Sequence, residues 1–364
     1  MEEKTERSFN VGVLGENQEL NTLIGQAFGA PGTKSDLQFF NRLDESLGYV
    51  FCAVMPVDYP EKIKPMLQTL TMTDIYVLVI DLNFGLNPVI GELLVAIDLF
   101  TRLYNKRLII TINNIKNNEW KLDDLKKKLK NILNTTNLHK IEVFEVENKD
   151  SLDLLKEKVV KLGINLLDQE EKEEINSYTK ILIDHVFPVK GIGTVALGVV
   201  KAGVLKKGQL LELVGFNGGK KKIIIKNIQK QDRNFNIAYK NDRVGLALKG
   251  VAVNEISRDN MLATPDIFKK EQTINAEVYL SEFYKPKEGK IIPGDNKQYY
   301  GLSNMQLTPL KFIEGSEIYP GSSGSVKITF DKPLYHDGSG ISGIITELNK
   351  FENKLRILGH FIQK

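Results

Sequence analysis

The segment from Gly15 to Thr22 places the strongest constraint on the fold, because it has the frame of a phosphate-binding loop. It follows an apolar strand pattern at Phe9–Leu14 and leads into a helical pattern that begins near Leu20. The motif G-x-x-x-x-G-K-S/T binds phosphate in this order of strand, loop and helix. Gly15 and Thr22 keep its first and last positions, whereas Leu20 and Asn21 replace its second glycine and its lysine. We therefore expect an α/β domain with an altered phosphate site.

Strand and helix patterns alternate over the first half of the chain. Continuous runs rich in Val and Ile predict buried strands at Val11–Leu14, Val50–Val54, Ile75–Ile80, Leu108–Thr111 and Ile141–Val146. Apolar residues at helical spacing predict helices at Val89–Leu103, Leu122–Leu133 and Leu152–Leu162. Such alternation is typical of βαβ units and of a mostly parallel sheet, which binds ligands at the carboxyl ends of its strands. The Gly15 loop lies at such an end.

The pattern changes after the acidic stretch Gln169–Glu174, which indicates a linker or a helix end. From Lys180 on, short alternating strands are separated by turns rich in Gly, Pro, Asn and Asp, as in antiparallel barrels. A second break at Thr264–Asp266 divides this half. We therefore predict three domains: an α/β domain over 1–170, and all-β barrels over 178–266 and 271–364.

Composition argues against several classes of protein. The net charge is only +3, so any nucleic-acid site would have to be a local patch. Cys52 is the single cysteine, which excludes an intrachain disulfide and favours a reducing, cytoplasmic location. The apolar runs are strand-length, so we expect no membrane segment. The four histidines are scattered, and we expect neither a metal site nor a catalytic Ser/His/Asp or Cys/His set.

A glycine-rich run in the second half carries a specific resemblance. Residues 186–209 read VFPVKGIGTVALGVVKAGVLKKGQ, with glycines at the positions of hairpin turns and barrel corners. The run resembles the opening of domain II in translational GTPases of the elongation factor Tu and SelB type. Residues 242–251 resemble the closing strands of that domain, and 320–323 and 355–360 resemble the third domain. The resemblance covers nearly the whole chain and implies a P-loop-GTPase-like domain followed by two β-barrels.

The resemblance also identifies the positions of the other nucleotide motifs. Family members carry D-x-P-G-H after a strand of the first domain, and here Asp58 is followed by Glu61 and Lys62 in place of the glycine and the histidine. The guanine motif N-K-x-D aligns with residues 113–116, where Asn113 is kept and Lys116 replaces the aspartate. The degenerate pocket implied by the resemblance comprises Gly15, Leu20, Asn21, Thr22, Asp58, Glu61, Lys62, Asn113 and Lys116.

These replacements remove the chemistry of nucleotide binding. Asn21 lacks the positive charge that meets the phosphates, Glu61 adds a carboxylate beside them, and Lys116 offers donors to the donors of guanine. Each lost charged hydrogen bond is worth roughly 1.5–3 kcal/mol, so several together exceed the ~8 kcal/mol of a micromolar complex. We expect no useful GTP binding, no GTPase activity and no cofactor.

Seven lysines in the second domain form a candidate RNA contact. They are Lys206, Lys207, Lys220, Lys221, Lys222, Lys226 and Lys230. Lysines next to strands and turns either protect sheet edges and keep the surface soluble, or bind a phosphate backbone. The sequence leaves both interpretations open.

Three functions follow from these observations. The first is a Tu/SelB-related factor with a pseudo-GTPase domain, which binds RNA or a protein; the family binds aminoacyl-tRNA across the two barrels and docks on the ribosome. The second is a GTP-binding elongation factor with atypical motifs, which would use GTP or GDP with magnesium. The third is a regulatory or assembly protein that uses the scaffold for protein partners. The sequence does not separate tRNA or the ribosome from a protein as the partner, and it leaves the oligomeric state open.

Overall fold

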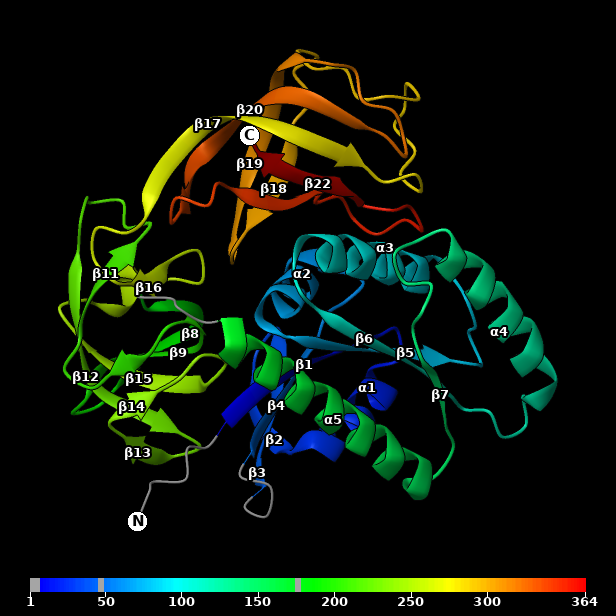
Figure 1. Cartoon of the computed structure of the whole chain (residues 1–364), viewed down its shortest axis with the longest axis horizontal. Coiled ribbons are helices and arrows are strands. Elements are labelled where there is room, and N and C mark those ends of the chain that lie inside the picture. Colours follow the sequence, from blue (N-terminus) through cyan, green and yellow to red (C-terminus); the bar gives the residue numbers. More distant parts are fainter. Residues whose placement is uncertain (1–6, 45–48, 174–177) are drawn as a thin grey trace.

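The structure is a computed structural model, which describes residues 7–44, 49–173 and 178–364. Its first part is a seven-stranded sheet in the order β2-β3-β4-β1-β5-β6-β7, covered by helices on both faces (Figure 1). The strands are β1 (Arg7–Gly15), β2 (Ala30–Lys34), β3 (Leu37–Asp44), β4 (Tyr49–Pro56), β5 (Ile75–Asp81), β6 (Arg107–Asn113) and β7 (Val143–Val146). The helices are α1 (Gln18–Phe28), α2 (Ile63–Met72), α3 (Pro88–Leu103), α4 (Glu119–Asn134) and α5 (Lys149–Glu173). Strands β4, β1, β5, β6 and β7 are parallel, and β2 and β3 extend the sheet in antiparallel pairing.

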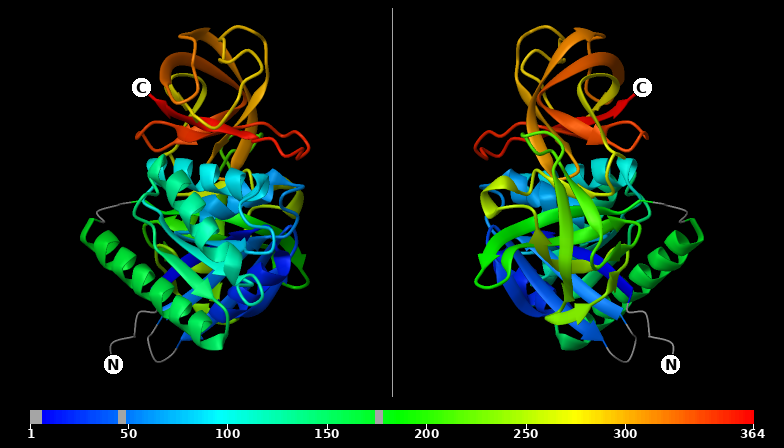
Figure 2. Two further views of the ribbon diagram at one scale, coloured as in Figure 1. Left: turned by 90° about the vertical axis from the view of Figure 1, so that its right-hand side faces the viewer. Right: turned by 90° about the vertical axis from the view of Figure 1, so that its left-hand side faces the viewer.

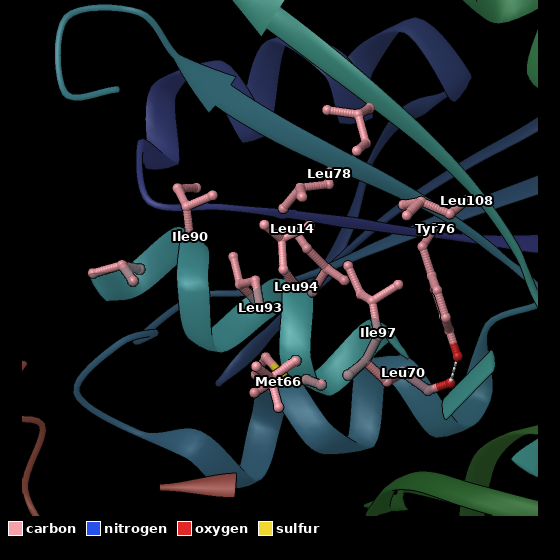
Figure 3. Packing of buried hydrophobic residues seen from close by; sticks show 14 of the residues in the cluster. Leu14, Met66, Leu70, Tyr76, Leu78, Ile90, Leu93, Leu94, Ile97 and Leu108 are labelled. Carbon is pink, nitrogen blue, oxygen red and sulfur yellow. Dashed lines mark hydrogen bonds between the residues drawn. The ribbon is translucent and has the colours of Figure 1, made fainter. Parts of the chain in front are cut away.

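Alternate residues of the central strands enter different cores, one on each face of the sheet. Leu14 and Leu78 pack with α2, α3 and α4, whereas Val13 and Val77 pack with α1 and α5. Figure 3 shows the first of these cores, where Leu14 and Leu78 point towards side chains of α3. The hydroxyl of Tyr76 is buried at its edge and donates a hydrogen bond to a backbone carbonyl of α2 at 2.7 Å. Two packed faces explain why most residues of β5 and β6 are apolar.

The second part of the chain forms two barrels. The first has the strand order β11-β16-β8-β9-β15-β12-β13, and the pairing of β11 with β12 closes it. Its strands are β8 (Lys180–Val189), β9 (Gly193–Ala202), β11 (Leu210–Val214), β12 (Lys222–Lys230), β13 (Arg233–Phe235), β15 (Arg243–Lys249) and β16 (Met261–Ala263), with a small ribbon of β10 (Leu205–Lys206) and β14 (Ile237–Ala238) and a 3-10 turn, η1 (Val253–Glu255). The second is a closed barrel of β17 (Lys269–Leu280), β20 (Ser323–His336), β19 (Gln306–Gly315), β18 (Tyr299–Ser303), β21 (Ser342–Thr346) and β22 (Ile357–Gln363). The predicted fold class, an α/β domain followed by two barrels, is confirmed.

Several elements differ from the sequence expectation. The pattern missed β2, β3 and α2, because β2 carries Pro31 and Gly32 and α2 carries Pro65 near its start. Helix α5 continues past the expected end at Leu162 to Glu173, because Leu166 and Leu167 keep an apolar face packed. The other expected strands and helices are present, with ends shifted by a few residues. The last residue of the expected linker, position 174, lies outside the described residues.

The barrels are joined to the α/β domain by polar contacts as well as apolar ones. Figure 2 shows the last barrel (orange to red) seated over the helices of the first domain. The ammonium of Lys201 on β9 lies 2.8 Å from the Asp74 carboxylate, which is buried before β5. The guanidinium of Arg258 contacts both carboxylate oxygens of Asp36 at 2.6 and 2.7 Å. The first barrel is therefore joined to the α/β domain by paired charges at their boundary.

Candidate functional site

The structure brings the nine expected pocket residues to one edge of the sheet. They lie at or just after the carboxyl ends of β1, β4 and β6, which are neighbours or near neighbours in the sheet. This is the edge at which open α/β sheets bind ligands. That this edge holds a degenerate nucleotide site stays a prediction.

Helix α1 begins at Gln18, within the segment that a phosphate-binding loop would occupy. Asn17 is its N-cap, and the side-chain oxygen accepts hydrogen bonds from the amides of Glu19 at 3.0 Å and Leu20 at 3.2 Å. Phosphate sites of this kind use free amides at a helix N-terminus. Here a side chain of the same chain satisfies two of those amides.

Asn21, which replaces the phosphate-binding lysine, points into the protein. It is fully buried, and its side-chain amide donates to the carbonyl of Gly15 at 2.9 Å, across the base of the loop. A Cβ on Gly15 would lie 2.5 Å from the side-chain oxygen of Asn21 and 2.6 Å from the carbonyl of Val79. Gly15 is therefore required by close packing, whether or not a phosphate binds.

Leu20 and Thr22 make ordinary helix contacts. The hydroxyl of Thr22 donates to the carbonyl of Gln18 at 2.8 Å, one turn earlier. Leu20 packs against the core beneath α1 and α5. In this arrangement the Thr22 hydroxyl points along its own helix instead of towards a phosphate-bound magnesium ion.

The loop after β4 holds an exposed ion pair. The ammonium of Lys62 lies 2.7 Å from the Asp58 carboxylate, with side chains 64% and 41% exposed. The hydrogen bond to Asp58 raises the pKa of Lys62 above its ordinary value. Glu61 is exposed beside them. Exposed pairs of this kind contribute little to stability.

The expected guanine motif is divided between the interior and the surface. Asn113 is 1% exposed, and its amide donates to the Thr111 hydroxyl at 3.0 Å. Its side-chain oxygen has no hydrogen-bond partner among the described residues. Lys116 is exposed in the following loop. A hydrogen bond of 2.9 Å from Asn118 to Asn83 ties this loop to the one after β5.

Sequence reasoning missed the residues that close the site. The Asn17 amide donates to Asp81 at 2.8 Å, and the Asn87 amide donates to the Glu16 carboxylate. Asp81 is 4% exposed at the end of β5. The signal for Asn17 was available, because Asn directly before a helical pattern is a preferred N-cap. The hydrogen bond from Asn17 to Asp81 joins the segments that follow β1 and end β5. No local pattern in the sequence predicts this contact.

The seven lysines of the candidate RNA contact separate into two groups. Lys220, Lys221 and Lys230 are ion-paired with Asp266, Glu255 and Asp242, respectively, and Lys230 is only 4% exposed. Lys206, Lys207, Lys222 and Lys226 are exposed.

These four exposed lysines lie on one part of the barrel. Lys222 and Lys226 project from the outer face of β12, where the intervening Ile223 and Ile225 point inwards. The turn that carries Lys206 and Lys207 is attached to the same strand, since the amide of Gly208 donates to the carbonyl of Ile225 at 2.8 Å. These four lysines, Lys206, Lys207, Lys222 and Lys226, are called the β12 lysine patch below.

Comparisons with known proteins agree with this architecture. Residues 193–258 match the family described as Elongation factor Tu domain 2. The "Uncharacterized protein MJ0325" of Methanocaldococcus jannaschii is 31% identical over 253 residues, which cover 69% of this chain and 72% of that protein. The "Selenocysteine-specific elongation factor" of the same organism is 32% identical over 238 residues, or 63% of this chain and 48% of that protein. The chain belongs to the translational GTPase family of the elongation factor Tu and SelB type.

Solved structures of this family share the fold along nearly the whole chain. Elongation factor SelB from Methanococcus maripaludis, solved with the GTP analogue GppNHp, matches with a TM-score of 0.79 at 22% identity and covers 98% of this chain and 79% of its own. A bacterial selenocysteine-specific elongation factor matches with a TM-score of 0.76 at 17% identity, over 98% and 58%. Within this family fold, Leu20 and Asn21 stand at the positions of the second glycine and the lysine of the phosphate-binding motif. None of the described helices is both long and apolar enough to span a bilayer.

Proposed function

We propose that this Tu/SelB-type chain is a pseudo-GTPase: a translation-linked factor whose first domain neither binds nor hydrolyses GTP and instead serves as a fixed platform for the barrels. The observation that carries the proposal is the capping of α1 by Asn17, which uses the amides of Glu19 and Leu20. Asn21 supports it, because the residue at the lysine position is buried and bonded to Gly15.

A phosphate and the Asn17 side chain would compete for the same backbone amides. A bound phosphate would have to displace the Asn17 cap, which stabilises a helix by about 1 kcal/mol. It would then meet the nearby carboxylates of Glu16 and Asp81, which hydrogen-bond to Asn87 and Asn17, with no lysine to offset their charge. The phosphates of GTP contribute much of its affinity in P-loop proteins through amides and a lysine.

Calorimetry with GTP and GDP in the presence of magnesium tests this proposal. We expect no binding heat at micromolar protein concentrations, while elongation factor Tu measured in parallel binds both nucleotides. A micromolar site that is lost on Thr22→Ala would contradict the proposal and support the alternative of a GTP-binding factor with atypical motifs.

We further propose that the β12 lysine patch contacts a nucleic-acid backbone, with tRNA or ribosomal RNA as the candidate partner. Four exposed ammonium groups on one strand and its attached turn form the kind of local patch that a chain of net charge +3 would need. The contact of Lys226 with the carbonyl of Ile192, at 3.2 Å, orients this side chain along the surface without neutralising it.

The patch is tested by changing Lys206, Lys207, Lys222 and Lys226 to Gln together. A matched control changes four exposed lysines of the last barrel: Lys285, Lys287, Lys350 and Lys354. We expect the patch variant to bind RNA more weakly for all sequences and to flatten the salt dependence, because each phosphate contact releases counterions. Equal loss in the control would mean that only overall charge matters.

If neither the unmodified chain nor the control variant binds RNA, the result favours the third function, a regulatory or assembly protein with a protein partner. Cytoplasmic location and the absence of a cofactor stay predictions of the sequence.

A further inference from the structure

A cavity of about 390 Å³ lies at the amino ends of β6 and β7, at the end of the sheet opposite the candidate nucleotide site. It is lined by the end of α3, the start of β6, the segment between α4 and β7, and α5. The apolar part of this lining consists of Leu108, Ile109, Leu138, Ile141 and Leu162. A cavity of this size can hold a small molecule.

The backbone of β6 lacks a neighbouring strand beside this cavity. The amide of Arg107 donates towards β5, to the carbonyl of Asp74 at 3.1 Å. The amide of Ile110 donates towards β7, to the carbonyl of Glu142 at 3.2 Å. Because these directions alternate along a strand, the amide and carbonyl of Leu108 point to the β7 side, at a level where β7 has not yet begun.

Neither backbone group of Leu108 has a hydrogen-bond partner among the described residues. Leu108 is only 5% exposed, and buried backbone amides are almost always hydrogen-bonded in folded proteins. The cavity next to this amide is therefore a place where a bound molecule can supply the missing acceptor.

Two cationic side chains that line the cavity have no counterion within the described part of the chain. The guanidinium of Arg107 donates to neutral oxygens, on Asn105 at 2.5 Å, on Gln169 at 3.2 Å and on its neighbour's backbone. Lys140 is exposed and forms no ion pair with another described residue. Both charges are available to an anion in the cavity.

The other two charged residues of the lining are already paired. The ammonium of Lys106 lies 3.8 Å from the Asp74 carboxylate. Glu142, which carries the one carboxylate among the lining residues, lies 2.7 Å from the ammonium of Lys158. The uncompensated charge at the cavity is therefore positive, next to a backbone donor and an apolar wall.

We propose that this cavity binds a small monocarboxylate with an apolar body, such as a medium-chain fatty acid or an aromatic acid. A carboxylate oxygen accepts the hydrogen bond of the Leu108 amide, while Arg107 and Lys140 supply the opposite charge. The apolar body packs against Ile141 and its apolar neighbours. A single negative charge fits better than a phosphate dianion, because the carbonyl of Leu108 and the carboxylate of Glu142 lie at the same cavity and repel added negative charge.

Calorimetry with octanoate on the full chain tests the proposed ligand class. We expect binding with a dissociation constant of about 1 mM or tighter, the range open to so small a ligand. Octanol has the same apolar body without the charge and should bind at least about tenfold more weakly. Octyl phosphate should bind no more tightly than octanoate. Equal binding of octanol, or tighter binding of octyl phosphate, would contradict the assignment of a carboxylate.

Two kinds of variant locate the binding site. Arg107→Gln with Lys140→Gln should weaken octanoate binding about tenfold or more. Arg233→Gln with Lys350→Gln, at exposed positions of the two barrels, removes the same charge and should leave binding unchanged. Ile141→Trp fills the cavity without changing the charge and should abolish binding. Circular dichroism confirms that each variant is folded. The proposal is overturned if octanoate does not bind the unmodified chain, or if either cavity variant binds it as tightly as the unmodified chain does.

Discussion

Glu92 of α3 and Arg356, just before β22, form a buried ion pair that joins the α/β domain to the last barrel. The guanidinium donates to the two carboxylate oxygens at 2.6 and 3.2 Å, and the backbone amide of Arg356 donates at 2.8 Å. The hydroxyl of Tyr59 adds a fourth hydrogen bond to Glu92 at 3.1 Å. The two side chains are 0% and 3% exposed. A charge removed from either side would leave the other unpaired in the interior.

Glu92→Gln is expected to destabilise the protein by about 3–5 kcal/mol, because it leaves the buried guanidinium of Arg356 without its counterion. Chemical denaturation followed by circular dichroism measures the loss. Lys62→Ala, which breaks the exposed pair with Asp58, is the control and should change stability by less than about 1 kcal/mol. Equal effects of the two substitutions would show that burial of the Glu92 pair is not what matters.

Leu20→Gly combined with Asn21→Lys is expected not to restore GTP binding. The two changes return the glycine and lysine of the motif, but Asn17 still caps α1 and Lys116 still replaces the guanine-binding aspartate. Calorimetry with GTP and magnesium on the folded double variant is the measurement. A micromolar binding heat would show that the phosphate contacts alone decide the affinity.

Asn17→Ala is expected to destabilise the protein by about 1–2 kcal/mol, because the amides of Glu19 and Leu20 lose their acceptor and Asp81 loses a donor. The change in denaturation midpoint measures it. Gln26→Ala, at an exposed position of the same helix, should stay within about 0.5 kcal/mol. The prediction fails if both variants unfold at the same denaturant concentration as the unmodified chain.

His360 is expected to make stability depend on pH between about 4 and 6.5. Burial and the nearby Arg102 guanidinium lower the pKa of this imidazole from 6.5 to about 4. Between these values the unfolded chain binds a proton that the folded chain does not, so stability falls as the pH drops from 6.5 towards 4. Urea denaturation of His360→Phe across this range should show a shallower decline. His139→Phe, at an exposed position, should decline as the unmodified chain does.

The sequence predicted the repeating part of the fold well. Buried strands such as β5 and amphipathic helices such as α4 bury a contiguous face. Their apolar residues therefore recur in the sequence at the spacing of a strand or a helix. Strand β2 was missed because Pro31 and Gly32 contradict its local pattern, and the strand forms only because β3 pairs with it. The glycines of 186–209 indicated the family, because tight turns and barrel corners require glycine at particular positions.

The candidate site likewise has some features that the sequence specifies and others that only the fold specifies. The sequence alone determined that Leu20, Asn21 and Lys116 lack the groups that bind phosphate and guanine, since a side chain's donors and charge are properties of the residue itself. Only the tertiary structure decided where those side chains point. The inward turn of Asn21 depends on Gly15, the cap at Asn17 is held by Asp81 from another strand, and the grouping of the lysines depends on which carboxylates the folded barrel brings within reach. Contacts between residues far apart in the chain leave no periodicity in the sequence, because they are selected by packing in three dimensions.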